Sequence, residues 1–332
     1  MTNPLDVTVR LDDRVRLMSA VLAATDWPLK SQTKKPHGTH LHARSTRKFL
    51  EVVKNHPAVQ AMQGLLDQNA PLEAFFTYAL QLSWPDLKVT GTTPSWVPPH
   101  WNEQLADFYV QARLATWWKN EEPSWQAGLR ESEKMFKDVA FKPMLKTFFG
   151  DVTENLIFIP NISYPTDVDL AVRAEHELVC IAPPRLAWGD SPPWPYDEDP
   201  GYIYRTALQQ YGKLLVHAYL LKHADELKSV VETPMPVSDQ FKARYPTWQE
   251  QFTVLFVAAI SALYMEKHLS KAEINAYVLM ERKMHGMTSL PGMISVLRRY
   301  LAAYEEGKYK ELIDFLPSFP RQFKIAAKIV SL

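Results

Sequence analysis

Residues 154–184, ENLIFIPNISYPTDVDLAVRAEHELVCIAPP, decide the fold class of this chain. They contain two short apolar runs, 156–159 (LIFI) and 178–181 (LVCI), and prolines follow each run closely. A short apolar run bounded by prolines is typical of a buried strand, whereas a helix needs a longer periodic segment. The stretch therefore predicts a small β-sheet in the middle of the chain.

Apolar residues recur at helical spacing on both sides of this stretch. Short helices are expected up to Gly150, a natural stop, and one of them is predicted to begin at a capping Ser45. Stronger helical segments occupy 207–223, 248–268, 271–284 and 293–304. The fold class is therefore α+β, mainly α-helical, with two lobes. The regions expected are 1–150 (N-terminal helices), 151–223 (the sheet and one long helix) and 224–332 (the C-terminal helical lobe).

The overall composition argues against several classes of partner. The 332 residues contain 37 Lys plus Arg and 37 Asp plus Glu, so the formal net charge is zero. No global field favours nucleic acid or an anionic membrane, and no nucleic-acid partner is expected. The longest apolar run, 252–265, is shorter than the roughly 20 residues that a bilayer requires, and it predicts a buried helix.

The compartment is predicted from the N-terminus and the cysteine content. No apolar segment follows a basic leader at the start of the sequence, which predicts that the chain has no signal peptide. Cys180 is the single cysteine, so an internal disulfide and a Cys-rich zinc site are both impossible. Together with the absence of a predicted membrane span, these features favour the cytoplasm.

Common nucleotide and nucleophile motifs are missing from the sequence. The eleven glycines form no G-x-G-x-x-G pattern, no phosphate-binding loop and no G-x-S-x-G elbow. Dinucleotide-binding proteins, P-loop enzymes and α/β-hydrolases are therefore disfavoured.

Two histidine motifs are candidate metal sites. In HELVC, His176 and Glu177 precede Cys180 at i+4, but the apolar run favours a strand, on which positions four apart lie about 13 Å from each other. Those residues could not share one metal ion, and Cys180 is expected in the core. His217 lies on a convincing helix with Leu221 at i+4, and a lone histidine on an apolar helix is more often a core residue than a ligand.

A third histidine cluster, PHGTHLHAR, contains His37, His40 and His42. On a strand, an H-x-H pair would place both rings on one face. Lysine and arginine residues surround the cluster, so a flexible basic loop is favoured, which binds metal weakly or contacts an anion.

An aromatic and acidic segment follows the second apolar run. Residues 183–200 are rich in proline and include Trp188, Trp194 and Tyr196 before a run of acidic residues. Such a long loop is usually functional or disordered. It either covers a cleft or docks a partner, or it is a proline-stiffened surface connection, and the sequence leaves both interpretations open.

The order of several segments resembles a bacterial, zincin-like (gluzincin-type) metallopeptidase family of unknown function. The segments span nearly the whole chain and are VRLDDRVRLMSAVLAATDW, NHPAVQAMQGLLD, WNEQLADFYVQARLATWW, FKPMLKTFFGD, NLIFIPNIS, KLLVHAYLLKH, RYPTWQEQFTVLFVAAISALYMEKHL and RRYLAAYEEGKYKELIDFLPSF. The resemblance implies a two-lobed zincin-like architecture in one continuous unit.

The residues of the family's zinc site can be placed on this sequence one by one. The first histidine of its His-Glu-x-x-His helix falls on His217, the general-base glutamate on Ala218 and the second histidine on Leu221. The third ligand, a glutamate on a later helix, falls on Val254. Alanine, leucine and valine side chains neither coordinate zinc nor move a proton. The resemblance therefore implies a degenerate member without a zinc cofactor, in which these apolar residues have turned the former site into core.

Three functions are consistent with these observations. The first is a non-catalytic, zincin-like protein that binds a peptide or protein partner, with the segment that carries Trp188, Trp194 and Tyr196 taking part in recognition. The second is a metal-dependent hydrolase with a non-standard site around His217, or around His176 and Glu177. The third is a structural interaction module.

Overall fold

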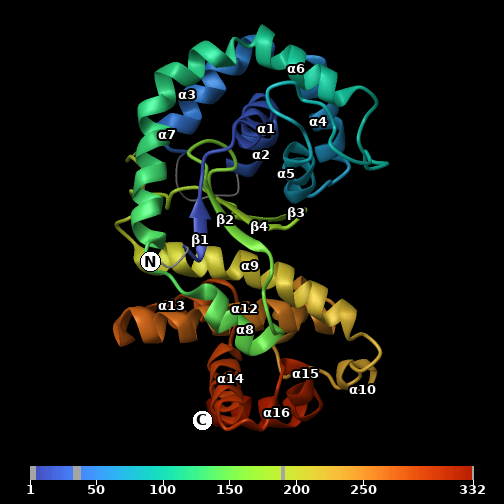
Figure 1. Ribbon diagram of the computed structural model, residues 1–332, viewed down its shortest axis with the longest axis vertical. Helices are drawn as coiled ribbons and strands as arrows, with labels where there is room; N and C mark the ends of the chain where they lie inside the picture. Colours follow the sequence, from blue (N-terminus) through green and yellow to red (C-terminus); the bar gives the residue numbers. More distant parts are fainter. Residues whose placement is uncertain (1–4, 33–38, 188–190, 331–332) are drawn as a thin grey trace. The chain divides into compact units, whose positions relative to one another are not determined.

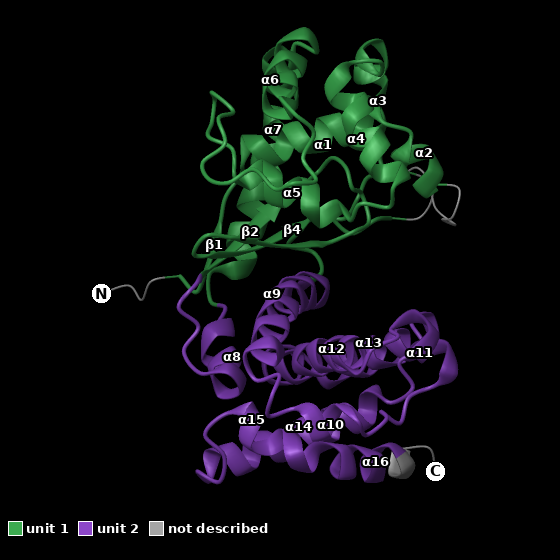
Figure 2. Ribbon diagram, turned by 90° about the vertical axis from the view of Figure 1, so that its right-hand side faces the viewer, with its two compact units in different colours: residues 1–138, 155–199 green, residues 139–154, 200–332 purple. Residues whose placement is uncertain are grey.

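A computed structural model describes residues 5–32, 39–187 and 191–330 of the chain, with the side chains of 328–330 excepted. The chain forms two compact units, each built from two segments (Figure 2). Unit 1 consists of Met1–Asp138 and Asn155–Asp199, and unit 2 of Val139–Glu154 and Pro200–Leu332. These boundaries differ from the three consecutive regions expected from the sequence, because the sheet belongs to the same unit as the N-terminal helices.

The sheet of unit 1 has four strands in the order β1-β2-β4-β3, counted over the described residues. Their bounds are β1 Val7–Val9, β2 Asn155–Pro160, β3 Leu170–Ala174 and β4 Glu177–Ala182. β1 and β4 run parallel to β2, and β3 runs antiparallel to β4 at the edge. β2 and β4 confirm the two predicted strands, whereas β1 and β3 were not predicted.

The two central strands are buried on both faces. Ile157 and Val179 point into a large apolar core that the helices of unit 1 share. Phe158, one residue further along β2, points to the other face, where its ring contacts those of Phe136 and Tyr196. Successive side chains of a strand alternate between the faces, so a strand covered on both sides needs a continuous apolar run.

The helices of unit 1 surround a buried central helix, α1 (Figure 1). Their bounds are α1 Asp13–Ala24, α2 Trp27–Gln32, α3 Leu41–Leu50, α4 Pro57–Asp67, α5 Leu72–Leu80, α6 Trp101–Gln111 and α7 Leu114–Phe136, with a short 3₁₀ helix, η1, at Glu51–Val53. α1 packs against α3, α4 and α5, and α7 packs against β1 and β2. α1 is buried over nearly its whole length, which explains its many apolar residues.

The start of α3 differs from the prediction. His40, not Ser45, caps the helix, and its Nδ1 atom accepts the backbone N–H of Ala43 at 3.3 Å. Residues 41–50 are therefore helical, and the prediction of a flexible basic loop around the histidines is wrong for this part of the cluster. A histidine cap is not among the capping residues that sequence patterns favour, which explains the error.

Unit 2 is a helical bundle around α12. Its elements are α8 Phe141–Phe149, α9 Pro200–Lys222, α10 Lys228–Val231, α11 Asp239–Arg244, α12 Trp248–His268, α13 Lys271–Met284, α14 Leu290–Glu305, α15 Leu312–Phe315, the 3₁₀ helix η2 Leu316–Ser318 and α16 Phe319–Val330. α12 and α13 have the bounds expected from the sequence, and the run 252–265 lies within α12 and is buried except at 253–254.

Two helix pairs in this bundle approach each other closely at glycines. A β-carbon on Gly212 of α9 would lie 3.0 Å from the Cγ1 atom of Val257 on α12. A β-carbon on Gly292 of α14 would lie 3.1 Å from the backbone nitrogen of Ala327 on α16. A β-carbon at either position would be closer than ordinary van der Waals contact, so neighbouring atoms would have to shift to make room for it.

The fold is mainly helical with a small mixed sheet, which confirms the α+β class. In the part of the chain that the structure covers, no helix combines the length and hydropathy of a membrane span.

Candidate functional site

The four positions assigned to the zinc site by resemblance lie on α9 and α12. His217, Ala218 and Leu221 are exposed on α9, and Leu221 is 71% exposed. Val254 on α12 is half-buried. The predictions that His217 is a core histidine and that Ala218 and Leu221 have become core are therefore wrong.

The geometry of α9 explains why these three residues are exposed. The buried face of this part of the helix is formed by Val216, Tyr219 and Leu220. Each residue of an α-helix is rotated by about 100° from the one before, so positions 217, 218 and 221 share the opposite face. Because the segment is largely apolar, its sequence does not show which side of the helix is buried.

The HELVC motif is part of the sheet. His176 lies in the turn before β4 and is exposed, while Cys180 is buried within the strand as predicted. Glu177 accepts two hydrogen bonds of 2.7 Å from the guanidinium of Arg10, which follows β1. Both carboxylate oxygens of Glu177 are thus engaged in an ion pair within the sheet.

The aromatic segment lies partly outside the described residues. Trp188 falls in the gap at 188–190, so its interpretation stays a prediction. Trp194 is 45% exposed, whereas Tyr196 is buried. Trp194 and Tyr196 therefore have different environments, although both belong to the same aromatic segment of the sequence.

Residues 196–197 are held firmly within unit 1 by contacts to β4 and α7. The Tyr196 hydroxyl donates to the carbonyl oxygen of Ala182 at 2.9 Å, and its backbone N–H donates to Glu131 of α7 at 3.0 Å. Asp197 pairs with Lys134 of α7 at 2.7 Å. These contacts favour the interpretation of this part of the segment as a fixed connection.

The histidine cluster is dispersed. His37 lies in the gap at 33–38, His40 caps α3, and His42 is 3.5 Å from Glu121 of α7. Burial lowers the pKa of His40 to about 4, which keeps its ring neutral near pH 7. Searching residues 5–32, 39–187 and 191–330 reveals no group of three or more His, Cys, Asp or Glu side chains placed to hold a metal ion.

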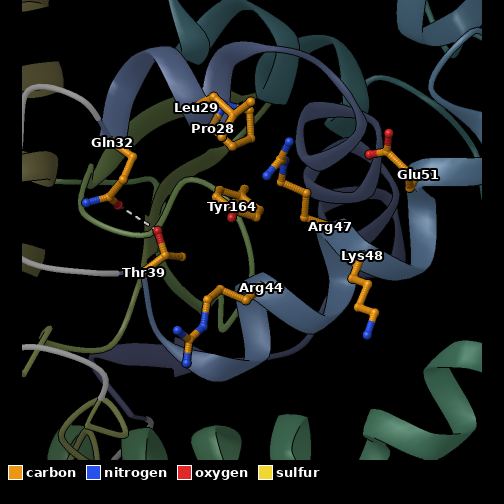
Figure 3. Close-up of a pocket in the computed structure, with 9 residues that line it drawn as sticks. All are labelled: Pro28, Leu29, Gln32, Thr39, Arg44, Arg47, Lys48, Glu51 and Tyr164. Carbon is orange, nitrogen blue, oxygen red and sulfur yellow. Dashed lines mark hydrogen bonds between the residues drawn. The ribbon is translucent and has the colours of Figure 1, made fainter.

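A basic cavity beside this cluster is the strongest candidate site (Figure 3). It has a volume of about 490 Å³, which is within the range of small-molecule sites. Its lining comes from α2, the segment just before α3, α3 itself, η1 and the loop after β2. It consists of Pro28, Leu29, Gln32, Thr39, Arg44, Arg47, Lys48, Glu51 and Tyr164. Helical spacing places Arg44, Arg47 and Lys48 on one side of α3.

The positive charges of this cavity outnumber its negative charges. Glu51, its acidic lining residue, forms an ion pair with Lys54 at 2.6 Å, and this hydrogen bond lowers the pKa of Glu51. Arg47 is half-buried, yet neither it nor Lys48 has a hydrogen-bond or ion-pair partner among the described residues. A partly buried guanidinium without an anionic partner marks a place where an anion would be stabilised.

Tyr164 supplies a neutral donor at the centre of the cavity lining (Figure 3). Its side chain is 3% exposed, and burial raises its pKa to about 12, so the hydroxyl stays protonated near pH 7. The side-chain amide of Asn161 holds the loop in place, since it donates to the carbonyl oxygen of Tyr164 and to the hydroxyl of Ser19, both at 3.0 Å.

Figure 3 shows how the polar groups are arranged. Gln32 and Thr39 lie on one side of Tyr164, joined by a hydrogen bond of 2.6 Å, and Arg47 lies on the other side. The ends of Arg44 and Lys48 extend outward from α3. Arg47 is thus the cation that the fold presets, while Lys48 is a long side chain that can turn toward a bound anion.

The sequence indicated this site only in part. The basic residues around the histidines suggested contact with an anion, and three of them, Arg44, Arg47 and Lys48, line this cavity. Tyr164 was missed, because a residue so distant in the chain joins the cavity only through the tertiary fold.

No protein-family model, curated protein or solved structure matches this chain.

Proposed function

We propose that this protein is a non-catalytic, zincin-like binding protein whose basic cavity in unit 1 holds an anionic group of its ligand. The observation that carries the proposal is Arg47, a half-buried cation without an anionic partner among the described residues, in a cavity of about 490 Å³. The buried hydroxyl of Tyr164 offers an additional donor. A cation and a neutral donor in a cavity lined also by Pro28 and Leu29 suit a small charged group on a larger ligand.

The zincin-like part of the proposal is supported by the order of the elements. The sheet strand β2, within the segment NLIFIPNIS, is followed along the chain by α9, which carries His217, and then by the buried helix α12, the order that the resemblance implies. Binding without catalysis is supported by the chemistry of the matched positions. His217, Ala218 and Leu221 offer one imidazole and two hydrocarbon groups, which cannot assemble a zinc-activated water.

The cavity is tested by calorimetric titration of the full chain with O-phosphoserine. A hydrogen bond to a charged group contributes about 1.5–3 kcal/mol. Replacing Arg47 by glutamine should therefore weaken binding by about 10- to 150-fold. Arg299→Gln removes the same charge from an exposed position on α14 and should leave the affinity unchanged. Equal affinities for all three proteins, or no binding by the unmodified chain, would refute the proposed cavity.

The zinc-free state is tested separately by elemental analysis of the purified protein and of a His217→Ala variant. The proposal predicts less than about a tenth of an equivalent of zinc in both proteins. Near one equivalent in the unmodified chain, lost in the variant, would show that His217 binds a metal after all.

A further inference from the structure

A second cavity adjoins the basic cavity and shares three lining residues with it. Its volume is about 620 Å³, and it lies along α2, η1 and α4. The shared residues are Leu29, Arg47 and Glu51. Arg47 therefore stands where the two cavities meet, and a ligand group bound to it can continue from one cavity into the other.

The wall of this second cavity, called the amide groove below, carries unused hydrogen-bonding groups. The side-chain amides of Asn55 and Gln60 are exposed and have no hydrogen-bond partner within the described part of the chain. A neighbouring amide, that of Gln63, is by contrast engaged with the backbone N–H of Asp26 and with Asp67. Asn55 and Gln60 each offer an N–H donor and a carbonyl acceptor, the two functions of a peptide group.

The amide groove also has room for a backbone. A β-carbon on Gly64 of α4, one of its lining residues, would meet no atom within 4 Å, so the helix presents an open surface there. Leu29, which is 50% exposed, and Ala24 add apolar contact area. An extended peptide needs this combination of polar partners and small apolar surfaces.

The charge of the basic cavity favours a doubly charged group. Arg47 and Lys48 have no ion-pair partner among the described residues, and the carboxylate of Glu51 is already paired with Lys54. A phosphate monoester carries a charge of about −1.5 to −2 near neutral pH, whereas a carboxylate carries one. An arginine guanidinium can donate two parallel hydrogen bonds to two oxygens of one phosphate, and the hydroxyl of Tyr164 adds a neutral donor.

We infer that the ligand is a phosphorylated peptide segment of a partner protein, with its phosphate in the basic cavity and its backbone along the amide groove. The inference rests on the proposed function, because it requires the basic cavity to bind an anion. Nucleic acid also carries phosphates, but base stacking requires an open aromatic face. Tyr164, the aromatic residue in the lining of the basic cavity, is buried.

The test is fluorescence anisotropy with two labelled heptapeptide mixtures that are degenerate at six positions and carry phosphoserine or phosphotyrosine at the centre. At least one mixture should bind the full chain about tenfold or more tightly than free O-phosphoserine, because the groove adds contacts to the backbone. The double variant Asn55→Ala with Gln60→Ala should lose about this gain and keep its affinity for free O-phosphoserine. Asn275→Ala, an exposed amide on α13, is the matched control and should change neither affinity.

The outcomes separate the two proposals. If free O-phosphoserine binds through Arg47 but neither mixture binds more tightly, the amide groove is not a peptide site and the basic cavity stands. If the double variant keeps the full affinity for the peptides, the inference is likewise overturned. A single-stranded oligonucleotide that binds more tightly than both mixtures and depends on Arg47 would assign the site to nucleic acid instead. If free O-phosphoserine does not bind, both proposals fail.

Discussion

Acidification should destabilise the fold through one residue, His40. Its side chain is 1% exposed, and its Nδ1 atom accepts the N–H of Ala43, so the neutral ring carries its proton on Nε2. Protonating Nδ1 would remove the acceptor that caps α3. The pKa of His40 in the folded chain is lowered to about 4. Burial is the main cause, and the charges of His42 and Arg44 also act to lower it.

The size and sign of the effect follow from the difference between the folded and unfolded pKa values. An unfolded histidine has a pKa of about 6.5, so between pH 6.5 and 4 the unfolded chain binds a proton that the folded chain does not. The stability that the neutral, buried ring of His40 contributes is fully present above pH 6.5 and is lost as the pH falls toward 4. The gap corresponds to about 3 kcal/mol in total, of which about 2.5 kcal/mol is lost at pH 4.5.

Urea unfolding at pH 7.5 and 4.5 measures this loss, with His40→Asn as the matched variant. Asparagine keeps a side-chain oxygen for the cap and does not titrate in this range. The free energy of unfolding of the unmodified chain should therefore fall by about 2.5 kcal/mol more than that of the variant. If both proteins lose the same free energy between these pH values, His40 is not the buried neutral cap described above.

Substitutions at two further positions, one in each unit, test the packing inside that unit. Tyr196→Phe should cost only about 1 kcal/mol, because Ala182 keeps a second hydrogen bond from the N–H of Asn161 at 2.9 Å. Tyr196→Ala should cost about 3–5 kcal/mol in urea unfolding, and a loss below about 1 kcal/mol would show that the segment is not anchored there. Gly292→Ala should lower the thermal midpoint, since overpacking against the fixed backbone of α16 costs about 1–3 kcal/mol. The control Gly64→Ala, with open space around it, should leave the midpoint unchanged or raise it by removing a helical glycine.

Much of the fold could be predicted because local patterns and tertiary environment agree. α12 and α13 begin after the capping residues Thr247 and Ser270, so both helices could be bounded from the sequence. β2 and β4 are covered on both faces, and their continuous apolar runs identify them. The edge strand β3 was missed because it includes the exposed, charged Arg173, and β1 because it is only three residues long.

The candidate site was harder to predict for a physical reason. Arg47 and Tyr164 lie far apart in the sequence, and only the tertiary fold brings them to one cavity. Helical periodicity also failed on α9, where Leu221 is apolar and exposed while its neighbour Leu220 is buried. A pattern of hydrophobic residues shows that a helix has a buried face, but the direction of that face depends on the elements that pack against it.

The division of each unit between two chain segments has a consequence for biosynthesis. β1, near the N-terminus, pairs with β2, where Val7 lies opposite Leu156, so the sheet of unit 1 cannot form until most of its second segment has left the ribosome. Conversely, α8 is synthesised before α9 and cannot pack until α9, its partner in unit 2, has also been synthesised. Expression of 1–138 or 200–332 alone would therefore yield a chain that lacks part of its own core. A fragment that joins 1–138 to 155–199 through a short linker is the smallest piece expected to fold as unit 1.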